Sequence, residues 1–347
     1  MGPIADGREK RERKGDPVSE LIPVLSGMRP TGKLHLGNYW GALVPWIQIQ
    51  NDGQHRCYFM VADLHALTTG YEDTAGIAAS VEDMVLDWLA AGLDPEKSVI
   101  FVQSRVPEHS ELALLLSMIT PLGWLERIPT YKEQLREITG REITTHGFLG
   151  YPVLQAADIM VYKAKAVPVG EDQLSHLELT QEIVRRFNRL YGPIFPEPKA
   201  ILGKAPKVPG LDGRKMSKSY GNAVELSDAP DVLWKKIQRM YTDPQKIRAD
   251  SPGRPEGCVV FALHKIYNPD APARETECRE GRIGCVACKK HLLTLLEPLQ
   301  AIQERRAVLA RKPGLVRDVL EEGSRRARVV AQATLAEAQA AMGLRPR

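Results

Sequence analysis

The sequence predicts an α/β protein in which a parallel β-sheet, covered by helices on both faces, is followed by a helical region. Short apolar runs alternate with helical patterns from about residue 21 to about residue 190, as is typical of parallel sheets. From about residue 228 onward the pattern is helical and no further strand is convincing. A chain of 347 residues is also too long for one comfortable core, so we expect a large domain and a smaller one.

The first strand is expected at residues 21–25. A loop with Pro30 and Gly32 follows it, and a helical pattern begins near Leu36. The later elements are strands at 57–61, 99–102 and 167–169 and helices at 75–91 and 171–190. Acidic residues open the last of these helices and arginines close it, as the helix dipole prefers. Within the C-terminal region we expect the Pro-, Gly- and Cys-containing segment 244–288 to be non-helical.

The two domains are expected at residues 20–227 and 228–347. Residues 1–19 are dense in charged residues and glycine and contain almost nothing apolar, so we interpret them as a flexible charged tail. Hydrophobic residues make up 43% of the chain and charged residues 26%, which excludes disorder throughout. No apolar run approaches the roughly 18 residues that span a bilayer, and no signal-type segment opens the chain. We therefore expect a cytoplasmic protein.

The basic charge of the chain lies near its C-terminus. The formal net charge is +4, yet the last 47 residues hold ten Lys or Arg against five Asp or Glu. A polyanionic partner is one interpretation of this asymmetry. The alternative is a set of arginines on the solvated faces of amphipathic helices.

The first candidate site is residues 26–38, which run Ser-Gly-Met-Arg-Pro-Thr-Gly-Lys-Leu-His-Leu-Gly-Asn. They lead from the end of a strand into a helix, and strand ends in such sheets are where ligands bind. Glycines let a ligand approach the backbone, and a helix N-terminus presents free N–H groups to phosphate. His35 and Asn38 share a face of the first turn, so a triphosphate would fit there. The alternative is a Gly/Pro turn with a capping Asn.

The second candidate site is residues 213–219, Gly-Arg-Lys-Met-Ser-Lys-Ser. Together, His-Leu-Gly-Asn at 35–38 and Lys-Met-Ser-Lys-Ser at 215–219 resemble the two signature motifs of class I aminoacyl-tRNA synthetases. Asn38 stands where the first motif commonly ends in His, which resembles the tryptophan branch of that class. The resemblance implies a Rossmann-like catalytic domain ending in the second motif, and a helical domain that binds the tRNA anticodon.

The implied chemistry needs positioning and cations rather than a nucleophilic side chain. The carboxylate of tryptophan is itself the nucleophile that attacks the α-phosphorus of ATP, and pyrophosphate leaves with developing negative charge. By resemblance, Lys215 and Lys218 stabilise that charge, Ser217 adds a hydroxyl donor, and His35 holds phosphates on the other side. Mg²⁺ shares the phosphate charge. Lys132 is a further phosphate candidate by resemblance, although a lone Lys is usually only solvated.

A third segment resembles the tryptophan branch specifically: Tyr-Pro-Val-Leu-Gln-Ala-Ala-Asp at 151–158 and Val-Pro-Val-Gly-Glu-Asp-Gln at 167–173. The indole N–H is only a donor, so a pocket for tryptophan needs an acceptor, for which a buried carboxylate is a strong choice. The resemblance assigns this role to Asp158, against the alternative of a helix-surface Asp. Gln155 departs from the branch, where Met is usual, and makes the pocket more polar.

The resemblance implies two sets of binding residues. The residues implied for tryptophan are Asp158, Tyr151, Gln155, Val167, Val169, His65 and Gln173. The residues implied for ATP are Gly27, Arg29, His35, Gly37, Asn38, Gly170, Asp172, Lys215, Met216, Ser217 and Lys218.

Four of the five cysteines lie between residues 258 and 288. Cys258, Cys278, Cys285 and Cys288 are separated by nineteen, six and two residues. Four thiolates hold either a tetrahedral Zn²⁺ or a [4Fe–4S] cluster, and spacing alone does not choose. Some bacterial members of the tryptophan branch resemble this chain in the final six-and-two spacing, around an iron–sulfur cluster, which favours iron–sulfur. Free or oxidised thiols are the alternative, because the first interval is shorter than is usual in the family.

The partners implied by the resemblance are L-tryptophan, tRNA(Trp) and a second copy of the chain in a homodimer, with neither a membrane nor DNA. Three alternatives remain open. A tyrosyl-type synthetase would use the same ATP motifs, although the run at 167–173 argues against it. A paralogue could bind tryptophan or ATP as a sensor or partner protein, and a non-synthetase adenylyltransferase would leave the basic helical domain without a role.

Overall fold

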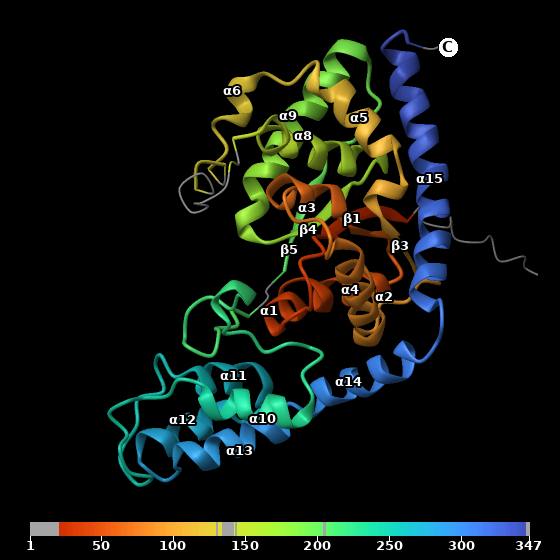
Figure 1. Cartoon of the computed structure of the whole chain (residues 1–347). Coiled ribbons are helices and arrows are strands. Elements are labelled where there is room, and N and C mark those ends of the chain that lie inside the picture. The colour runs from red at the N-terminus through yellow and green to blue at the C-terminus, as the bar shows by residue number, and fades with distance from the viewer. Residues whose placement is uncertain (1–20, 130, 134–141, 143, 204–205, 345–347) are drawn as a thin grey trace, which may run out of the picture.

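The computed structural model describes residues 21–129, 131–133, 142, 144–203 and 206–344. The sequence predictions for residues 1–19 lie outside this range. Figure 1 shows an α/β body that contains the sheet, a smaller group of helices below it, and a long C-terminal helix that returns along the α/β body.

The sheet has five parallel strands in the order β3-β2-β1-β4-β5. They are β1 (Ile22–Met28), β2 (His55–Val61), β3 (Ser98–Val102), β4 (Ala166–Val169) and β5 (Lys199–Leu202). The first four confirm the predicted strands. The strand β5 was not predicted, since its four residues include a Lys and lie at the edge of the sheet, where burial is only partial.

Both faces of the sheet are buried because most positions of its central strands are apolar. In β2, Cys57, Phe59 and Val61 enter one core, and Tyr58 and Met60 enter the other. Successive side chains of a strand point to opposite faces, so a continuous apolar run requires helices on both sides. The doubly wound, Rossmann-like fold class predicted from the sequence is confirmed.

Helices cover both faces of the sheet. Those of the α/β region are α1 (Leu36–Asn38), η1 (Tyr39–Leu43), α2 (Val44–Asn51), α3 (Asp63–Gly70), α4 (Ile77–Ala91), η2 (Gln103–Arg105), α5 (Glu108–Ser117), α6 (Leu122–Leu125), α8 (His146–Val161), η3 (Glu171–Gln173) and α9 (Leu174–Tyr191). The helix predicted at 75–91 begins two residues later and ends at Gly92, whose φ of 120° suits glycine. The helix predicted at 171–190 begins with the short helix η3 and continues as α9.

The C-terminal helices follow the short helix η4 (Lys218–Tyr220). They are α10 (Pro230–Arg239), α11 (Val259–Tyr267), α12 (Ala271–Arg279), α13 (Cys285–Leu295), α14 (Glu297–Ala310) and α15 (Leu315–Ala341). The expectation that segment 244–288 is non-helical is wrong for α11 and α12. The Pro and Gly residues fall in the loops or, as with Pro272, in the first turn of a helix, where they do not interrupt it.

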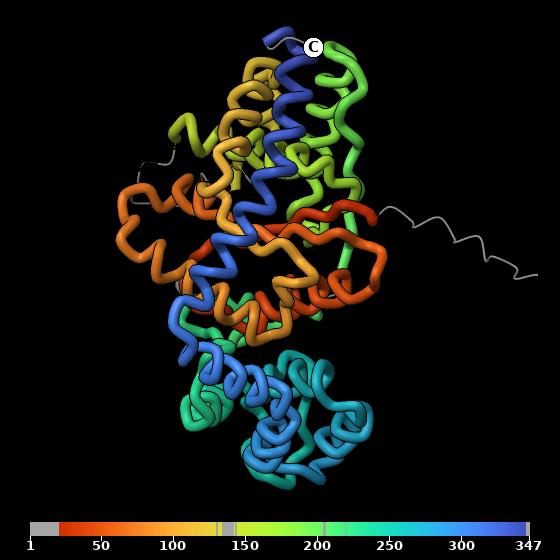
Figure 2. Tube along the Cα trace, turned by 90° about the vertical axis from the view of Figure 1, so that its right-hand side faces the viewer, coloured from red at the N-terminus to blue at the C-terminus, as the bar shows by residue number. Residues whose placement is uncertain are grey.

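The last two helices return to the α/β body (Figures 1 and 2). The helix α14 packs on α4, and α15 packs along the edge strand β3 and on α5. A Cβ atom at Gly323 would lie 1.8 Å from the carbonyl oxygen of Ile100, so glycine is what lets α15 approach the strand. Two helices of segment 228–347 therefore pack on the α/β body, and the domain boundary at 228 remains a prediction.

Much of the basic excess near the C-terminus is used in packing. Arg305 donates to the carbonyl of Ala90, Arg326 donates to the carbonyl of Pro95, and Arg328 pairs with Glu108. These arginines hold α14 and α15 to the α/β body. A polyanion-binding surface is not the explanation for these three charges. In the described parts of the chain, no helix is both long and apolar enough to cross a membrane.

Candidate functional site

The carboxyl ends of β1 and β4 meet at the centre of the sheet. The chain builds β1, β2 and β3 toward one edge and β4 and β5 toward the other, so the strand order reverses between β1 and β4. Ser26 near the end of β1 donates from its hydroxyl to the carbonyl of Pro168 in β4, at 3.2 Å. Ligands of open α/β sheets bind at this kind of reversal.

The first predicted motif begins at the end of β1. Gly27 lies in the strand, where a Cβ atom would approach the carbonyl oxygen of Met60 to 3.1 Å, and Arg29 follows it with an exposed side chain. His35 is the N-cap of α1: its Nδ1 accepts from the N–H of Asn38 at 3.3 Å, and its own N–H donates to Asn38 Oδ1 at 3.1 Å. The capping function considered for Asn38 is therefore real, and it holds the His35 ring close over Gly37.

The second predicted motif lies against the first, although the two are far apart in the sequence. Lys218 donates from Nζ to the carbonyl of Thr31 at 2.9 Å. The backbone that follows the second motif pairs with the first: Leu36 N–H donates to Val224, and Leu226 N–H donates to Leu34, at 3.0 and 2.8 Å. The structure thus brings together the two segments that the sequence pairs as ATP motifs.

Within the second motif, Lys215 is exposed and Met216 is buried, while Ser217 and Lys218 are half-buried. The N–H of Ser217 donates to Asn222 Oδ1 at 2.8 Å. The buried Met216 and this bond fix the loop, while the exposed Lys215 extends from it.

Burial lowers the pKa of two side chains, His35 and Lys218, where the two motifs meet. Burial and, to a smaller extent, the positive charge of Lys218 lower the pKa of His35 to about 4, against a smaller upward effect of a backbone hydrogen bond. His35 is therefore neutral at pH 7, and its ring can take part in hydrogen bonds but carries no charge. Burial also lowers the pKa of Lys218, while Glu225 and Asp87 raise it.

Asp158 on α8 is at the centre of a buried hydrogen-bond network. Its exposed fraction is 1%. Oδ2 accepts from His65 Nε2 at 2.7 Å, and Oδ1 accepts from His109 Nδ1 at 2.6 Å and from Gln103 Nε2 at 2.8 Å. The alternative of a helix-surface Asp is wrong. On the other side of His109, Nε2 lies 2.7 Å from the hydroxyl of Tyr162.

These contacts fix the ionisation of Asp158. Burial raises its pKa, but the hydrogen bonds and charges of His109 and His65 outweigh burial and lower the pKa to about 2. An ionised carboxylate only accepts and offers about four lone-pair positions, of which the three neighbours take three. Among the hydrogen bonds of the described residues, the position that remains is on Oδ2, where an N–H donor can bind.

The other residues predicted for tryptophan surround this carboxylate from three elements. Tyr151, Gln155 and Asp158 follow one another on one face of α8 at helical spacing. The ring of Tyr151 lies 6.4 Å from that of His65, and its hydroxyl lies 3.1 Å from His176 Nε2. The strand β4 contributes Val167, buried in the same apolar cluster as the network, and Val169 at its margin.

The end of β4 leads into the remaining predicted residues. A Cβ atom at Gly170 would lie 2.6 Å from Oδ1 of Asp172, so glycine lets that carboxylate fold back over the backbone. Gln173 donates to Asp172 at 3.1 Å. Lys132 is exposed in a helical segment at 131–133, and within the described residues no hydrogen bond or ion pair joins it to the site.

Sequence reasoning missed Gln103, His109 and Tyr162. A signal for Gln103 was present, because it directly follows β3 at the carboxyl edge of the sheet, where functional side chains gather. His109 and Tyr162 lie inside apolar helical stretches, and their contacts with Asp158 depend on how α5 packs against α8. No pattern along the chain encodes that packing.

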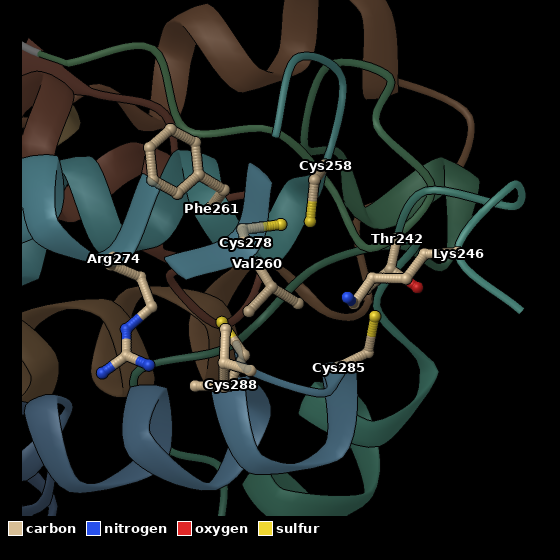
Figure 3. A pocket seen from close by; sticks show the side chains of 10 residues that line it. Thr242, Lys246, Cys258, Val260, Phe261, Arg274, Cys278, Cys285 and Cys288 are labelled. Atoms are coloured by element: carbon tan, nitrogen blue, oxygen red, sulfur yellow. The ribbon is translucent and has the colours of Figure 1, made fainter. Parts of the chain in front are cut away.

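The four clustered cysteines line one small cavity in the C-terminal helical region, together with Lys246 (Figure 3). Cys258 precedes α11, Cys278 lies in α12, and Cys285 and Cys288 lie in the first turn of α13. All five cysteines of the chain are free. Among the described residues, no three His, Cys, Asp or Glu side chains converge closely enough to hold a single metal ion.

Two arginines near this cavity are paired with carboxylates. Arg279 binds the carboxylates of Glu256 and Glu275, and Arg282 binds Glu280 at 2.5 Å. Burial raises the pKa of the Cys288 thiol to about 12, against the charge of the nearby Arg274.

Comparison with known proteins relates this chain to one family of enzymes. A family model described as tRNA synthetases class I (W and Y) matches residues 19–299. The chain is 51% identical to the tryptophan–tRNA ligase of Thermotoga maritima, over 92% of this chain and 99% of that protein. The tryptophanyl-tRNA synthetase of Campylobacter jejuni, crystallised with ADP and tryptophan, is 32% identical with a TM-score of 0.83 over 93% of this chain and 100% of that one. The tyrosyl-tRNA synthetase of Archaeoglobus fulgidus, with a TM-score of 0.63 at 20% identity over 83% of this chain and 90% of that one, shares the fold alone.

Proposed function

This chain belongs to the class I tRNA synthetases for tryptophan and tyrosine, and we propose that it activates L-tryptophan with ATP and transfers it to tRNA(Trp). The observation that supports tryptophan most strongly is the buried, ionised Asp158 with one lone-pair position left on Oδ2. Indole offers one N–H donor and a large apolar ring, which match that position and the apolar residues around it.

The reaction proceeds without a protein nucleophile. The carboxylate of tryptophan attacks the α-phosphorus of ATP, the bond to the β-phosphate oxygen breaks, and tryptophanyl-adenylate and pyrophosphate form. Lys215 and Lys218 stabilise the charge on the leaving pyrophosphate, with Ser217 as a further donor. Neutral His35 donates to the phosphates from the opposite motif, and Lys132 is a candidate for further phosphate contact once ATP is bound.

Ammonium groups and backbone N–H groups of the two motifs suit phosphate oxygens. The proposed ATP contacts are Gly27, Arg29, His35, Gly37, Asn38, Gly170, Asp172, Lys215, Met216, Ser217 and Lys218. Most of these groups are donors, so Mg²⁺ would be carried mainly by the phosphates, where it shares their charge.

Pyrophosphate exchange tests this function. Isotope exchange between pyrophosphate and ATP should depend on L-tryptophan and not on L-tyrosine, and the protein should then charge tRNA(Trp). Exchange that requires tyrosine would establish the tyrosyl-type alternative. Ligand binding without exchange would establish a sensor or partner protein.

We propose that the four cysteines hold a [4Fe–4S] cluster. The cysteines line a common cavity, but no three of them converge as the ligands of one Zn²⁺ must, at about 2.3 Å from the ion. A cluster of four irons needs thiolates spread around a larger centre. The proposed cluster would lie in the C-terminal helical region, away from the strand ends. It would hold the helices of that region together and take no part in adenylation.

The cluster has its own test. Anaerobically purified protein should be brown and contain iron and sulfide, and Cys285→Ser with Cys288→Ser should remove both and weaken tRNA binding while sparing pyrophosphate exchange. Cys57→Ala changes a cysteine outside the cavity and should retain the iron. Zinc without iron would identify the alternative metal, and colourless protein with neither metal would refute the site.

Transfer to tRNA requires the protein to bind a polyanion. We assign this binding to the helical region around α13. Phosphate contacts make affinity fall with salt, so tRNA binding should weaken steeply between low and high salt. Salt-independent affinity would contradict this assignment. Deleting residues from about 300 onward is not a clean test, because α15 packs on β3 and its loss would destabilise the α/β body.

We also propose a homodimer whose interface includes α5 and α6. Leu114 in α5, Met118 directly after α5 and Leu122 at the start of α6 are 57%, 69% and 65% exposed, although they are large and apolar. The mass in solution should be that of two chains, and Met118→Glu should shift it toward one. Because the substrate is a tRNA, we place the protein in the cytoplasm.

A further inference from the structure

Asp87 is a buried carboxylate that none of the roles assigned above uses. It lies on α4 with an exposed fraction of 0%. Its Oδ2 accepts from the backbone N–H of Leu34 at 3.3 Å, and its Oδ1 accepts from Arg306 Nε at 2.6 Å. A buried charge is retained only where it is paired and hydrogen-bonded, so the two contacts explain how Asp87 is tolerated.

Arg306 comes from a distant part of the chain. It lies on α14, which follows directly on α13 and leads to α15 (Figure 1). A second nitrogen of its guanidinium, Nη2, binds Asp83 at 2.6 Å, and the side chain of Arg306 is 18% exposed. One planar group thus connects two carboxylates of α4 to the helix that leaves the four-cysteine region.

The other end of this connection is the ATP site. Leu34 is 2% exposed and directly precedes His35, and its carbonyl accepts from Leu226 N–H behind the second motif. The negative charge of Asp87 also acts on Lys218, whose ammonium group contacts the loop at Thr31. Asp87 therefore contacts the backbone of one ATP motif and lies within electrostatic reach of the other.

We propose that Arg306 and Asp87 are positioning residues for ATP: Arg306 holds and neutralises Asp87, which in turn holds the loop between β1 and His35 in place. The proposal rests on ATP being the substrate of the two motifs. It makes the ATP side of the site depend on α14, a helix of the C-terminal region.

The pair should act on ATP and not on tryptophan. Leu34 and the two neighbours of Asp87 on α4, Leu86 and Trp88, belong to the core on the α4 side of the sheet, whereas the Asp158 network lies on the α8 side. Burial raises the pKa of Asp87, and the hydrogen bond and charge of Arg306 oppose this rise. If Arg306 is replaced by an apolar residue, the fraction of Asp87 that stays ionised is unpaired and repels ATP, and Leu34 loses the fixed position of its acceptor.

The test is tryptophan-dependent pyrophosphate exchange, together with calorimetric binding of ATP and of tryptophan to each variant. Arg306→Met should raise KM and Kd for ATP about tenfold or more, with the Kd for tryptophan within about twofold of wild type. Arg306→Lys keeps a charge near Asp87 and should recover part of the loss. Arg305→Met is the matched control, because Arg305 lies next in the same helix but binds the carbonyl of Ala90.

A double variant separates the charge from general packing. Asp87→Asn keeps an acceptor for Leu34 and removes the charge, so Asp87→Asn with Arg306→Met should bind ATP better than Arg306→Met alone. A structural role alone would make the double variant worse. Should Arg306→Met fail to fold, the ATP affinity of the double variant is compared with that of Arg306→Lys.

Three results would overturn the proposal: unchanged ATP affinity in folded Arg306→Met, an equal loss of ATP and tryptophan affinity, or a double variant no better than the single one. Wild-type protein without tryptophan-dependent exchange would refute the proposed function instead. Calorimetric ATP binding would then still test the pair.

Discussion

On the proposed tryptophan side of the site, Asp158 is 1% exposed and receives hydrogen bonds from three side chains. On the proposed ATP side, Lys215 is exposed and the half-buried Lys218 reaches a backbone carbonyl of the opposite motif. One side is a fixed acceptor inside the protein, and the other is a set of cations at a surface where two segments meet.

The difference follows from what each side must recognise. Choosing one amino acid requires a buried polar group whose partner is missing when the wrong ligand binds, because the unpaired group then carries a large cost. Binding a triphosphate requires cations that follow charge as it moves onto pyrophosphate during the reaction. The tryptophan side is therefore rigid before binding, while the ATP side is completed by its substrate.

The largest expected effect is on the tryptophan side. Asp158→Ala removes the acceptor for the indole N–H and also leaves His65, His109 and Gln103 without their common partner. We expect a loss of about 2 to 4 kcal/mol in transition-state binding, a factor of about 30 to 1000 in kcat/KM for tryptophan. Pyrophosphate exchange with tryptophan and with phenylalanine measures it.

The comparison with phenylalanine decides what the loss means. Phenylalanine has no N–H on its ring, so its own kcat/KM should fall much less than that of tryptophan. An unchanged preference for tryptophan over phenylalanine would show that Asp158 supports the fold and does not contact the indole.

The next largest effect is on the ATP side and should differ in kind. Lys218→Ala should lower kcat for adenylate formation about 100-fold, the lower end of the range for a transition-state donor, because Lys218 is half-buried and screened by water. Lys215→Ala should act in the same direction. Single-turnover rates and tryptophan affinity separate the two steps, and a pure loss of tryptophan affinity at an unchanged rate would contradict the role in pyrophosphate departure.

The sequence predicts the ATP side better than the tryptophan side. Glycines, prolines and lysines in short segments are local signals, so the motifs at 35–38 and 215–219 could be found without knowing the fold. Four strands were predictable for the same reason, since each is a continuous apolar run. The strand β5, with Lys199 in a run of four residues, gives no such signal.

The neighbours of Asp158 could not be predicted in this way. His65 and Asp158 are 93 residues apart, and Gln103 and Asp158 are 55 apart. Their contacts exist because α3, the end of β3 and α8 meet at one edge of the sheet. The pair of Asp87 and Arg306, 219 residues apart, escaped prediction for the same reason, since it depends on α14 packing against α4.

A smaller effect tests how far the fixed network on the tryptophan side extends. Tyr162→Phe removes the hydroxyl that faces His109 Nε2, and His109 then loses a partner that helps to keep its Nδ1–H directed at Asp158. We expect a loss of about 1 kcal/mol, or about fivefold in kcat/KM for tryptophan, with ATP kinetics unchanged. Tyr58→Phe is the matched control, because Tyr58 stacks on Tyr162 at 4.5 Å between ring centroids and is equally buried. Equal effects of the two variants would mean that packing, and not the hydroxyl, is what matters.

The last expected effect is on stability and is a dependence on pH that the two sides share. Burial lowers the pKa of His176 beside Tyr151 and of His35 at the ATP motifs from 6.5 to about 4. In the unfolded chain both histidines take up a proton near pH 6.5, but in the folded protein they do so only near pH 4. The free energy of unfolding should therefore be constant above about pH 6.5 and fall as the pH is lowered toward 4. Asp158, whose pKa is lowered from 3.8 to about 2, adds a further loss only below pH 3.8.

Denaturant unfolding at pH 7 and pH 5 measures the loss of stability to which both histidines contribute. Adding ATP should separate the contribution of His35 from that of His176. His176→Gln and His35→Gln should each reduce the loss of stability between these pH values, because each removes a group that the unfolded chain protonates first. Bound ATP brings negative charge to His35 and not to His176, so it raises the pKa of His35 alone. With saturating ATP the wild-type protein should then lose less stability on going to pH 5, and His35→Gln should abolish this benefit of ATP while His176→Gln retains it. If both variants retained it, the phosphates would not lie beside His35, and the ATP side of the site would have to be reassigned.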